Sequence, residues 1–184
     1  MNIFPVKCAI ALGTNAPGGI AVFQMACNLL QQHGFTVERL AAAIITKPVD
    51  CPPGTPDFFN SALIGTFSGS AEELLEITQS IEQTLGRPVD HGFHLPRPLD
   101  LDIIIFGDKQ MQTPCLTLPH PRAQERMFVL EPLNEIAPDW VFPDSKKSVA
   151  IRHAQPCTTA QKLSQQLQGQ QRTWISAQPA ATNR

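Results

Sequence analysis

The chain has 184 residues, of which 42% are hydrophobic and 16% are charged, and its formal net charge is −2. This length suits one domain with an ordinary hydrophobic core, and the composition excludes a disordered chain and a metal-stapled miniprotein. The near-neutral charge argues against broad binding to nucleic acid or acidic membranes, because such binding needs a basic surface.

The N-terminus and the cysteines indicate a protein of a reducing compartment. The chain does not open with a basic segment followed by a long apolar segment, and no apolar run approaches the ~18 residues of a membrane span. The five cysteines are odd in number and form no C-x-x-C pair, which is typical of free thiols. We therefore expect a cytoplasmic monomer with neither membrane nor nucleic-acid partners.

Hydrophobic periodicity and turn residues predict the elements in chain order. The expected strands and helices are a strand at 8–12, a helix at 20–33, strands at 35–46 and 58–67, a helix from Ser70 to Gly86, a strand at 99–106, and a helix or strand at 128–136. Ser70 and Glu73 form a capping box at the start of the second helix. The proline-rich residues 47–56 are expected to form a loop.

The order of these elements predicts the fold class. Strand, helix, strand, strand, helix, strand is the order of an α+β domain of the ferredoxin-like, split β-α-β type. Its antiparallel sheet would have helices packed on it. We expect this domain to occupy residues 1–145, and residues 146–184 to form a polar C-terminal extension, because glutamine and small polar residues dominate there.

Two aspartates, Asp100 and Asp102, lie two residues apart in the clearest predicted strand. Side chains alternate between faces, so both carboxylates would project from one face, about 7 Å apart. The apolar residues expected to point together into the core are Leu99, Leu101, Ile103 and Ile105. Adjacent carboxylates repel each other, and a Mg²⁺ ion shared with phosphate oxygens would remove the repulsion. Two solvated aspartates on an edge strand are the alternative interpretation.

Basic residues precede and follow this strand. They are Arg87, Arg97, His120, Arg122 and Arg126. Carboxylates that hold a metal, together with guanidinium groups, form the usual set of contacts for a polyphosphate. The sequence has no P-loop, dinucleotide-binding or protein-kinase motif. Phosphoryl chemistry would therefore use a different type of site.

Six segments together form a specific pattern. They are Ala11–Asn15, Pro56–Asn60, Ile81–Arg87, Pro96–Asp102, Leu118–Arg122 and Arg126–Pro138. In this order they resemble the 6-hydroxymethyl-7,8-dihydropterin pyrophosphokinase family of folate biosynthesis, over about residues 7–143. The resemblance implies transfer of pyrophosphate from ATP, the co-substrate, to the hydroxymethyl group of the dihydropterin, with release of AMP.

The resemblance also implies roles for individual residues. Arg97, Asp100 and Asp102 would be catalytic, and the two aspartates would bind two Mg²⁺ ions that bridge the ATP phosphates. The ATP-binding residues would be Glu82, Arg87, Arg97, His120 and Arg126. The pterin-binding residues would be Thr46, Pro48, Val49, Phe58, Asn60, His94 and Phe128.

Two departures from the family pattern keep alternatives open. Residues 88–95 contain no Arg or Lys, where the family generally has basic residues and a tryptophan, and Cys115 replaces a frequent basic residue. Two lost charge-assisted contacts would cost several kcal/mol, at roughly 1.5–3 kcal/mol each. The alternatives are a diverged paralogue that acts on another pterin or only binds ligands, and a Mg²⁺-dependent hydrolase or nucleotidyltransferase.

Overall fold

The computed structural model describes residues 4–48, 53–86 and 98–155, and it contains a five-stranded antiparallel sheet. The elements are β1 (Val6–Thr14), α1 (Ala21–Gln32), β2 (Thr36–Leu40), β3 (Ile44–Thr46), β4 (Phe58–Phe67), α2 (Ala71–Thr84), β5 (Asp100–Phe106), β6 (Met111–Gln112), β7 (Thr117–Leu118), the 3-10 helix η1 (Ala123–Glu125), α3 (Met127–Ile136) and α4 (Val149–Ala154). The strand order is β2-β4-β1-β5, with β3 also paired to β4. This order confirms the predicted ferredoxin-like α+β fold.

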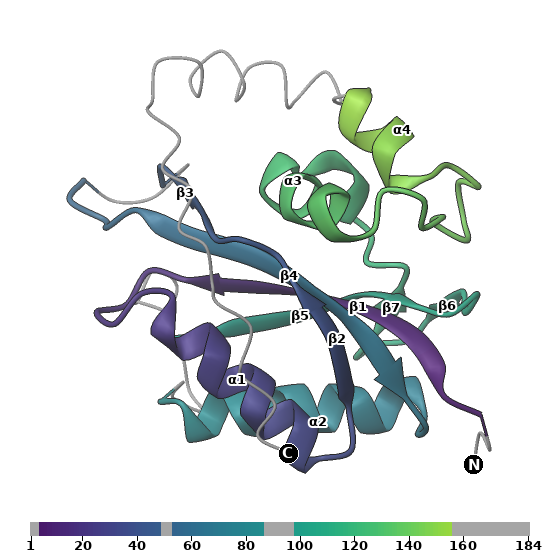
Figure 1. Cartoon of the computed structure of the whole chain (residues 1–184), viewed down its shortest axis with the longest axis horizontal. Coiled ribbons are helices and arrows are strands. Elements are labelled where there is room, and N and C mark those ends of the chain that lie inside the picture. The colour runs from purple at the N-terminus through teal and green to yellow at the C-terminus, as the bar shows by residue number, and fades with distance from the viewer. Residues whose placement is uncertain (1–3, 49–52, 87–97, 156–184) are drawn as a thin grey trace, which may run out of the picture.

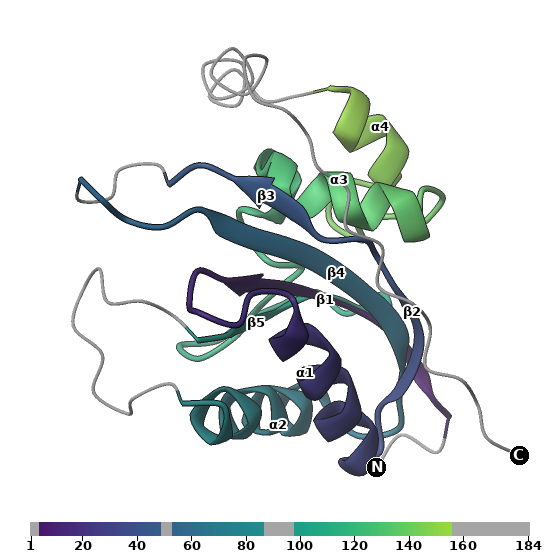
Figure 2. The ribbon, with the colours of Figure 1, turned by 60° about the vertical axis from the view of Figure 1, so that its left-hand side comes forward.

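Helices cover both faces of the sheet (Figures 1 and 2). Helices α1 and α2 lie on one face, where Phe23, Leu30 and Leu74 pack against apolar residues of β1 and β4. Helices α3 and α4 lie on the other face, where Leu130 and Val149 join a second core. Each sheet face is thus buried against a helical layer, and the main sheet lies between two hydrophobic cores.

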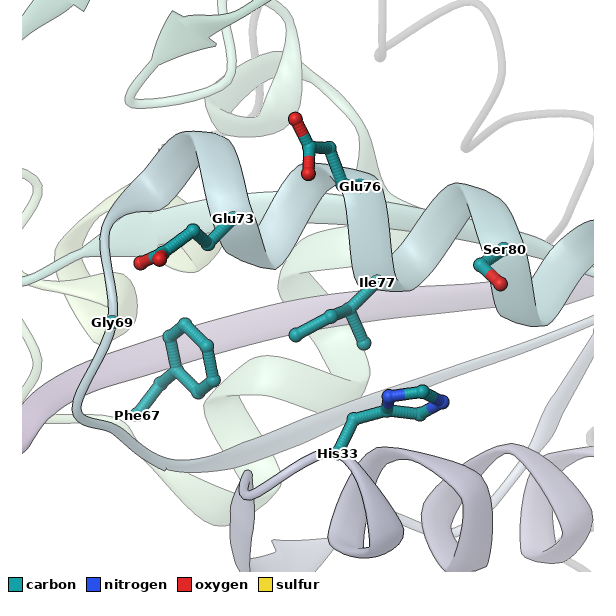
Figure 3. Close-up of a pocket in the computed structure, with 7 residues that line it drawn as sticks. All are labelled: His33, Phe67, Gly69, Glu73, Glu76, Ile77 and Ser80. Carbon is teal, nitrogen blue, oxygen red and sulfur yellow. The ribbon is translucent and has the colours of Figure 1, made fainter.

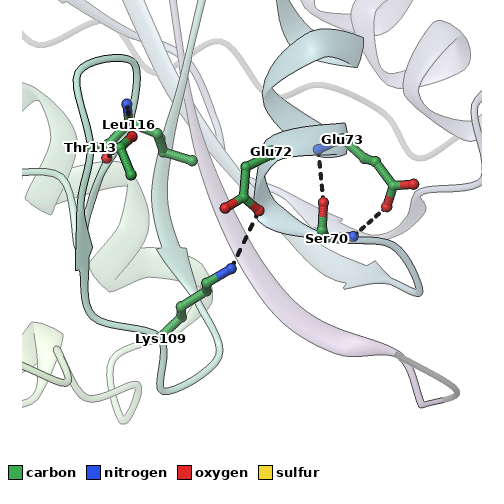
Figure 4. A network of polar contacts seen from close by, with 6 residues as sticks. All are labelled: Ser70, Glu72, Glu73, Lys109, Thr113 and Leu116. Carbon is green, nitrogen blue, oxygen red and sulfur yellow. Dashed lines mark hydrogen bonds and ion pairs between the residues drawn. The ribbon is translucent and has the colours of Figure 1, made fainter. Parts of the chain in front are cut away.

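The predicted capping box at the start of α2 is confirmed (Figure 4). The Glu73 backbone N–H donates to Ser70 Oγ at 3.1 Å, and the Ser70 N–H donates to Glu73 Oε2 at 2.6 Å. Next to it, Lys109 Nζ lies 3.3 Å from Glu72 Oε2. The capping box satisfies two N–H groups of the helix terminus, and the exposed ion pair links α2 to the turn after β5.

The prediction that Ile105 shares a face with Leu101 and Ile103 is wrong. Leu101 and Ile103 belong to the core under α1 and α2, whereas Ile104 and Ile105 both belong to the core under α3. The cause is a β-bulge: Ile103 pairs with Ile10 and Ile105 pairs with Ala9, so Ile104 is the extra residue. Alternation is therefore regular from Leu99 to Ile103 and is reset beyond it.

Residues 35–46, predicted as one strand, form two strands. Strand β2 pairs with the second half of β4 and β3 pairs with its first residues, Phe58–Asn60. Between them the Ala41 N–H donates to the Ala62 carbonyl at 2.8 Å, while the Ser61 hydroxyl donates to the Ala41 carbonyl at 2.9 Å. The Ser61 side chain thus takes the place of a backbone hydrogen bond between the strands. This occurs where the alanine-rich residues 41–43, which lack β-branched side chains, run beside β4.

The fold includes residues beyond the expected domain end at 145. Helix α4 contacts α3 and η1, and Val149 is fully buried. Residues 156–184 lie outside the described residues, so the polar extension stays a prediction. Within the described ranges, no helix is both long enough and apolar enough to cross a membrane.

Three cysteines are described, and all three are free thiols, as predicted for them. Cys8 and Cys27 are buried, and burial raises the pKa of Cys8 to about 12 and that of Cys27 to about 11. Both thiols therefore stay protonated and act as small apolar groups in the core. Cys115 is exposed. Cys51 and Cys157 lie outside the described residues.

Candidate active site

A row of three paired residues lies at one end of the sheet, where β1 ends and β4 and β5 begin: Asn60 on β4, Gly13 on β1 and Asp100 on β5. Directly paired residues of antiparallel strands point to the same face. A methyl group added to Gly13 would lie 3.7 Å from Asn60 Oδ1 and 3.9 Å from Asp100 Cβ. Because Gly13 has no side chain, the sheet surface between the Asn60 amide and the Asp100 carboxylate stays uncovered. These two groups were predicted to bind different substrates.

The next row consists of Ala62, Ala11 and Asp102. The two alanines belong to the core under α3, so Asp102 and Asp100 both project from the α3 side of the sheet, as strand alternation predicts. Asp100 is half-buried and Asp102 is exposed. Because β5 is an edge strand, both carboxylates lie at the border of the sheet and can be approached by a ligand.

Three basic residues lie near Asp102. The backbone N–H of His120 donates to the Ile104 carbonyl at 3.0 Å, which places His120 beside β5. Burial lowers the pKa of Arg126; the nearby Arg122 lowers it further, and Asp102 opposes the shift. His120 and Arg126 thus interact with Asp102, Arg122 lies near both of them, and the Glu125 carboxylate also acts on Arg126. A cationic cluster of this kind would be stabilised by a polyanion.

His120 is set to donate a hydrogen bond. Burial lowers its pKa; the Asp102 carboxylate opposes this shift, while Arg126 and Arg122 add to it. The imidazole is therefore neutral at pH 7. The backbone N–H of Arg122 donates to His120 Nδ1 at 3.3 Å, so the neutral ring carries its proton on Nε2. An Nε2–H donor suits the predicted contact with a phosphate oxygen.

Three of the predicted pterin residues, Thr46, Phe58 and Asn60, lie on the same side of the sheet. Thr46 pairs with Phe58, which lies two residues before Asn60 on β4, so all three share a face. Asn60 Nδ2 donates to Thr46 Oγ1 at 2.9 Å, and this bond orients the Asn60 amide. Pro48 follows Thr46 and is half-buried.

Phe128 borders this site from α3. Its side chain is 38% exposed, and its ring centroid lies 5.4 Å from Cζ of Arg126. An aromatic ring with a guanidinium group over it is a cation–π pair. The residue predicted to contact the pterin and a residue predicted to contact phosphate therefore touch each other at the start of α3.

Glu82 is buried on α2, and its Oε1 accepts a hydrogen bond from the Leu101 N–H at 2.7 Å. Leu101 lies between Asp100 and Asp102. The observed contact therefore supports the strand that carries both aspartates, while the predicted contact of Glu82 with ATP stays a prediction. Periodicity places Glu82 on the helix but cannot show that its carboxylate reaches the backbone of β5.

Replacing Glu82 by alanine is expected to lower both stability and kcat/KM. The buried Leu101 N–H would lose its acceptor, at a cost of about 1–3 kcal/mol, and β5 would lose its anchor to α2. Glu82→Gln keeps an acceptor oxygen and should retain most of both quantities. Urea unfolding and steady-state kinetics measure them. Equal losses in the two variants would instead assign the role of Glu82 to its negative charge.

Four of the predicted residues lie outside the described residues, and their placement stays a prediction: Val49, Arg87, His94 and Arg97. Three further features of the site region did not come from sequence reasoning. They are the uncovered sheet surface at Gly13, the hydrogen bond that Asn60 donates to Thr46, and the ion pair of Lys47 with Asp57 at 2.7 Å. The ion pair joins the two ends of the loop between β3 and β4.

A surface cavity of about 390 Å³ lies elsewhere, between the end of α1 and the helix α2 (Figure 3). Its lining includes Phe67 and Ile77, which pack in the core under α1 and α2, and the carboxylates of Glu73 and Glu76. The aspartates of β5 project from the opposite face of the sheet. Two negative charges at its wall also make this cavity unsuitable for a triphosphate.

Known proteins show the same combination of segments. The model of the 7,8-dihydro-6-hydroxymethylpterin-pyrophosphokinase (HPPK) family matches residues 9–138. The chain is 39% identical over 150 residues to 2-amino-4-hydroxy-6-hydroxymethyldihydropteridine pyrophosphokinase of Synechocystis sp., covering 79% of this chain and 75% of that protein. It is 41% identical over 128 residues to the protein of the same name from Bacillus subtilis, covering 69% and 75%.

Longer proteins match over part of their length. The folate synthesis bifunctional protein of Arabidopsis thaliana is 36% identical over 148 residues, which cover 80% of this chain and 30% of that protein. The crystal structure of Plasmodium falciparum HPPK-DHPS with pteroate superimposes with a TM-score of 0.68 at 12% identity, over 90% of this chain and 46% of that one. At this identity the likeness concerns the fold alone. With the family match over residues 9–138, the chain belongs to the 7,8-dihydro-6-hydroxymethylpterin-pyrophosphokinase family.

Proposed function

We propose that this protein transfers the pyrophosphoryl group of ATP to the hydroxymethyl group of 6-hydroxymethyl-7,8-dihydropterin, with release of AMP, in folate synthesis. Membership of the pyrophosphokinase family supports this reaction. The observation that carries the proposal is the row of Asn60, Gly13 and Asp100. It places the amide expected to bind the pterin and one of the two aspartates expected to bind Mg²⁺ on either side of a glycine.

Magnesium fits the donor atoms of this site. Asp100 and Asp102 offer hard oxygen ligands from one face of an edge strand, and Mg²⁺ usually takes one or two carboxylates and completes its shell with phosphate oxygens and water. Among the described residues, no group of three or more potential ligands (His, Cys, Asp or Glu) occurs. When bound, two Mg²⁺ ions would neutralise the charge of the triphosphate.

The protein side chains divide the work of binding. The His120 Nε2–H and the guanidinium groups of Arg126 and, by resemblance, Arg97 and Arg87 would hold phosphate oxygens. Asn60, oriented by Thr46, would contact the polar edge of the pterin, and the exposed ring of Phe128 would cover its face. The remaining expected pterin contacts are Phe58, Pro48, Val49 and His94.

The reaction is a single in-line displacement. The hydroxymethyl oxygen attacks the β-phosphorus of ATP and releases its proton to solvent, the bond from this phosphorus to the bridging oxygen of the α-phosphate breaks, and AMP leaves with that oxygen. Catalysis comes from positioning and from cations that face the developing charge, without a covalent intermediate. His120 and Arg126 are both half-buried, and the bond to His120 Nδ1 and the Phe128 ring beside Arg126 favour their orientations before the substrate arrives.

Incubation of the protein with hydroxymethyl-dihydropterin and MgATP tests this function. We expect one AMP and one pterin pyrophosphate for each ATP consumed. Free phosphate or pyrophosphate as the product would indicate a hydrolase or nucleotidyltransferase. Tight pterin binding without AMP release would indicate a binding protein, the alternative that the lack of Arg and Lys in residues 88–95 motivates. The proposal also includes a cytoplasmic monomer, which gel filtration of the purified chain checks for oligomeric state.

A further inference from the structure

Gln124 is a buried polar residue between two of the cationic residues of the site. It lies in η1, and its side chain is 7% exposed. Arg122 precedes η1 and Arg126 follows it, two positions away on either side. Neither Arg122 nor Arg126 forms a side-chain cap for the helix that it begins. Local backbone hydrogen bonds, such as that of the Arg126 N–H to the Ala123 carbonyl at 3.3 Å, hold the turn itself, while its place in the fold depends on contacts with other segments.

The side chain of Gln124 is engaged at both of its polar atoms. Nε2 donates to the two carboxylate oxygens of Asp144 at 3.0 and 2.8 Å. Oε1 accepts from Ser145 Oγ at 2.7 Å and from Arg152 Nε at 2.6 Å. The amide can occupy this place in one orientation only, with its NH₂ toward the carboxylate and its oxygen toward the cation.

The partners of Gln124 belong to a firmly packed segment, residues 142–152. Phe142 and Val149 are fully buried in the core under α3. The Phe142 N–H donates to the Lys147 carbonyl at 3.0 Å, and Gln110 Nε2 donates to the Pro143 carbonyl at 3.1 Å. The segment is thus tied to the fold independently of η1, and it gives Gln124 a fixed support.

Resting on the proposed function, we propose that Gln124 is a positioning residue for the nucleotide: it fastens η1 to residues 142–152 and so holds Arg122 and Arg126 against their mutual repulsion, ready for the phosphates of ATP. Asp102 and Glu125 offset only part of the repulsion between the two guanidinium groups, which tend to separate when no anion is bound. A buried, fully satisfied hydrogen-bond network resists this displacement. The expected pterin contacts on β3 and β4 do not depend on η1, and the one on α3, Phe128, is followed by Val129 and Leu130, which anchor α3 in the core.

An exchange of donor and acceptor tests the proposal. In Gln124→Glu two carboxylates meet, and the donor to Asp144 is lost. In the double variant Gln124→Glu/Asp144→Asn the amide introduced at position 144 donates to the new carboxylate, which still accepts from Ser145 and Arg152, and the net charge returns to that of the wild type. The matched control is Lys147→Ala, which removes a hydrogen bond to Gln155 in the same segment, away from η1.

Calorimetric titration with a non-hydrolysable MgATP analogue, and separately with the pterin, gives the decisive comparison. We expect Gln124→Glu to raise the Kd of the ATP analogue about tenfold and to change the pterin Kd less than twofold. The double variant should return to within about threefold of the wild type, and Lys147→Ala should match the wild type. A merely structural role would lower the unfolding midpoint without this difference between ligands.

Two results would overturn the inference. One is an unchanged Kd for the ATP analogue in folded Gln124→Glu; the other is an equal loss for both ligands that the double variant does not restore. If Gln124→Glu does not fold, Ser145→Ala replaces it, because this variant removes a single hydrogen bond to Gln124 Oε1. It should raise the Kd of the ATP analogue about twofold to threefold. An unchanged Kd would again overturn the inference. A wild-type protein that binds no ATP would refute the proposed function itself, which separates the two failures.

Discussion

Replacement of Asp100 or Asp102 by asparagine is expected to lower turnover by about 10²- to 10³-fold while the fold stays intact. Loss of one preorganised electrostatic contact to the transition state typically costs this much. Each substitution keeps the shape of the side chain and removes the negative charge that a metal–triphosphate complex needs. Asp102 is exposed and Asp100 half-buried, so the unfolding midpoint should change little. AMP formation at saturating substrates measures the effect.

Asp108→Asn is the matched control for this pair. Asp108 is an exposed aspartate in the turn that follows β5, at the opposite end of the strand from the proposed site. It should keep wild-type turnover. If either Asp100→Asn or Asp102→Asn kept more than a tenth of the wild-type rate, that carboxylate would not hold a catalytic metal.

The elements that local physics determines could be predicted from the sequence. The capping box of Ser70 and Glu73, the apolar stripe of α2 and the alternation around Asp100 and Asp102 depend on neighbours a few residues away. Strand β4 was predicted with the bounds that the structure has, Phe58–Phe67. The order of these elements was then enough to predict the topology.

The features that could not be predicted depend on partners far away in the chain. The bulge at Ile104 is a property of the pairing of β5 with β1, and no residue type within β5 signals it. The hydrogen bonds of Gln124 to Asp144 and Arg152 join residues 20 and 28 positions apart. A glutamine between two arginines looks like an ordinary surface residue until these partners are in place.

The candidate site shows the same division. The motifs supplied the residue types, but motifs alone do not show that Asn60 and Asp100 border the same glycine, since that follows from the register of three strands. The lowered pKa of His120 likewise comes from burial and from cations that the fold brings near. The residues that carry chemistry were therefore predictable as a set, and their mutual arrangement required the fold.

Replacement of Gly13 by leucine is expected to lower kcat/KM about 10²-fold without loss of stability, since a displacement of reacting groups by ~1 Å can cost that much. The leucine side chain would extend from the sheet surface between Asn60 and Asp100, where both substrates are proposed to meet. Gly13 is not among the residues with positive φ, so leucine fits the backbone without strain, and loss of a strand glycine should hold or raise the unfolding midpoint.

Gly13→Ala separates this effect from any general intolerance of side chains at the position. Its methyl group would meet Asn60 Oδ1 and Asp100 Cβ at 3.7 and 3.9 Å, which are ordinary contact distances, so this variant should keep most of its activity. Steady-state rates, pterin titration and thermal unfolding of the two variants give the comparison. A stable leucine variant with near-normal kcat/KM would mean that the reacting groups do not meet above Gly13, because a four-carbon side chain cannot share that space with a pterin and a phosphate.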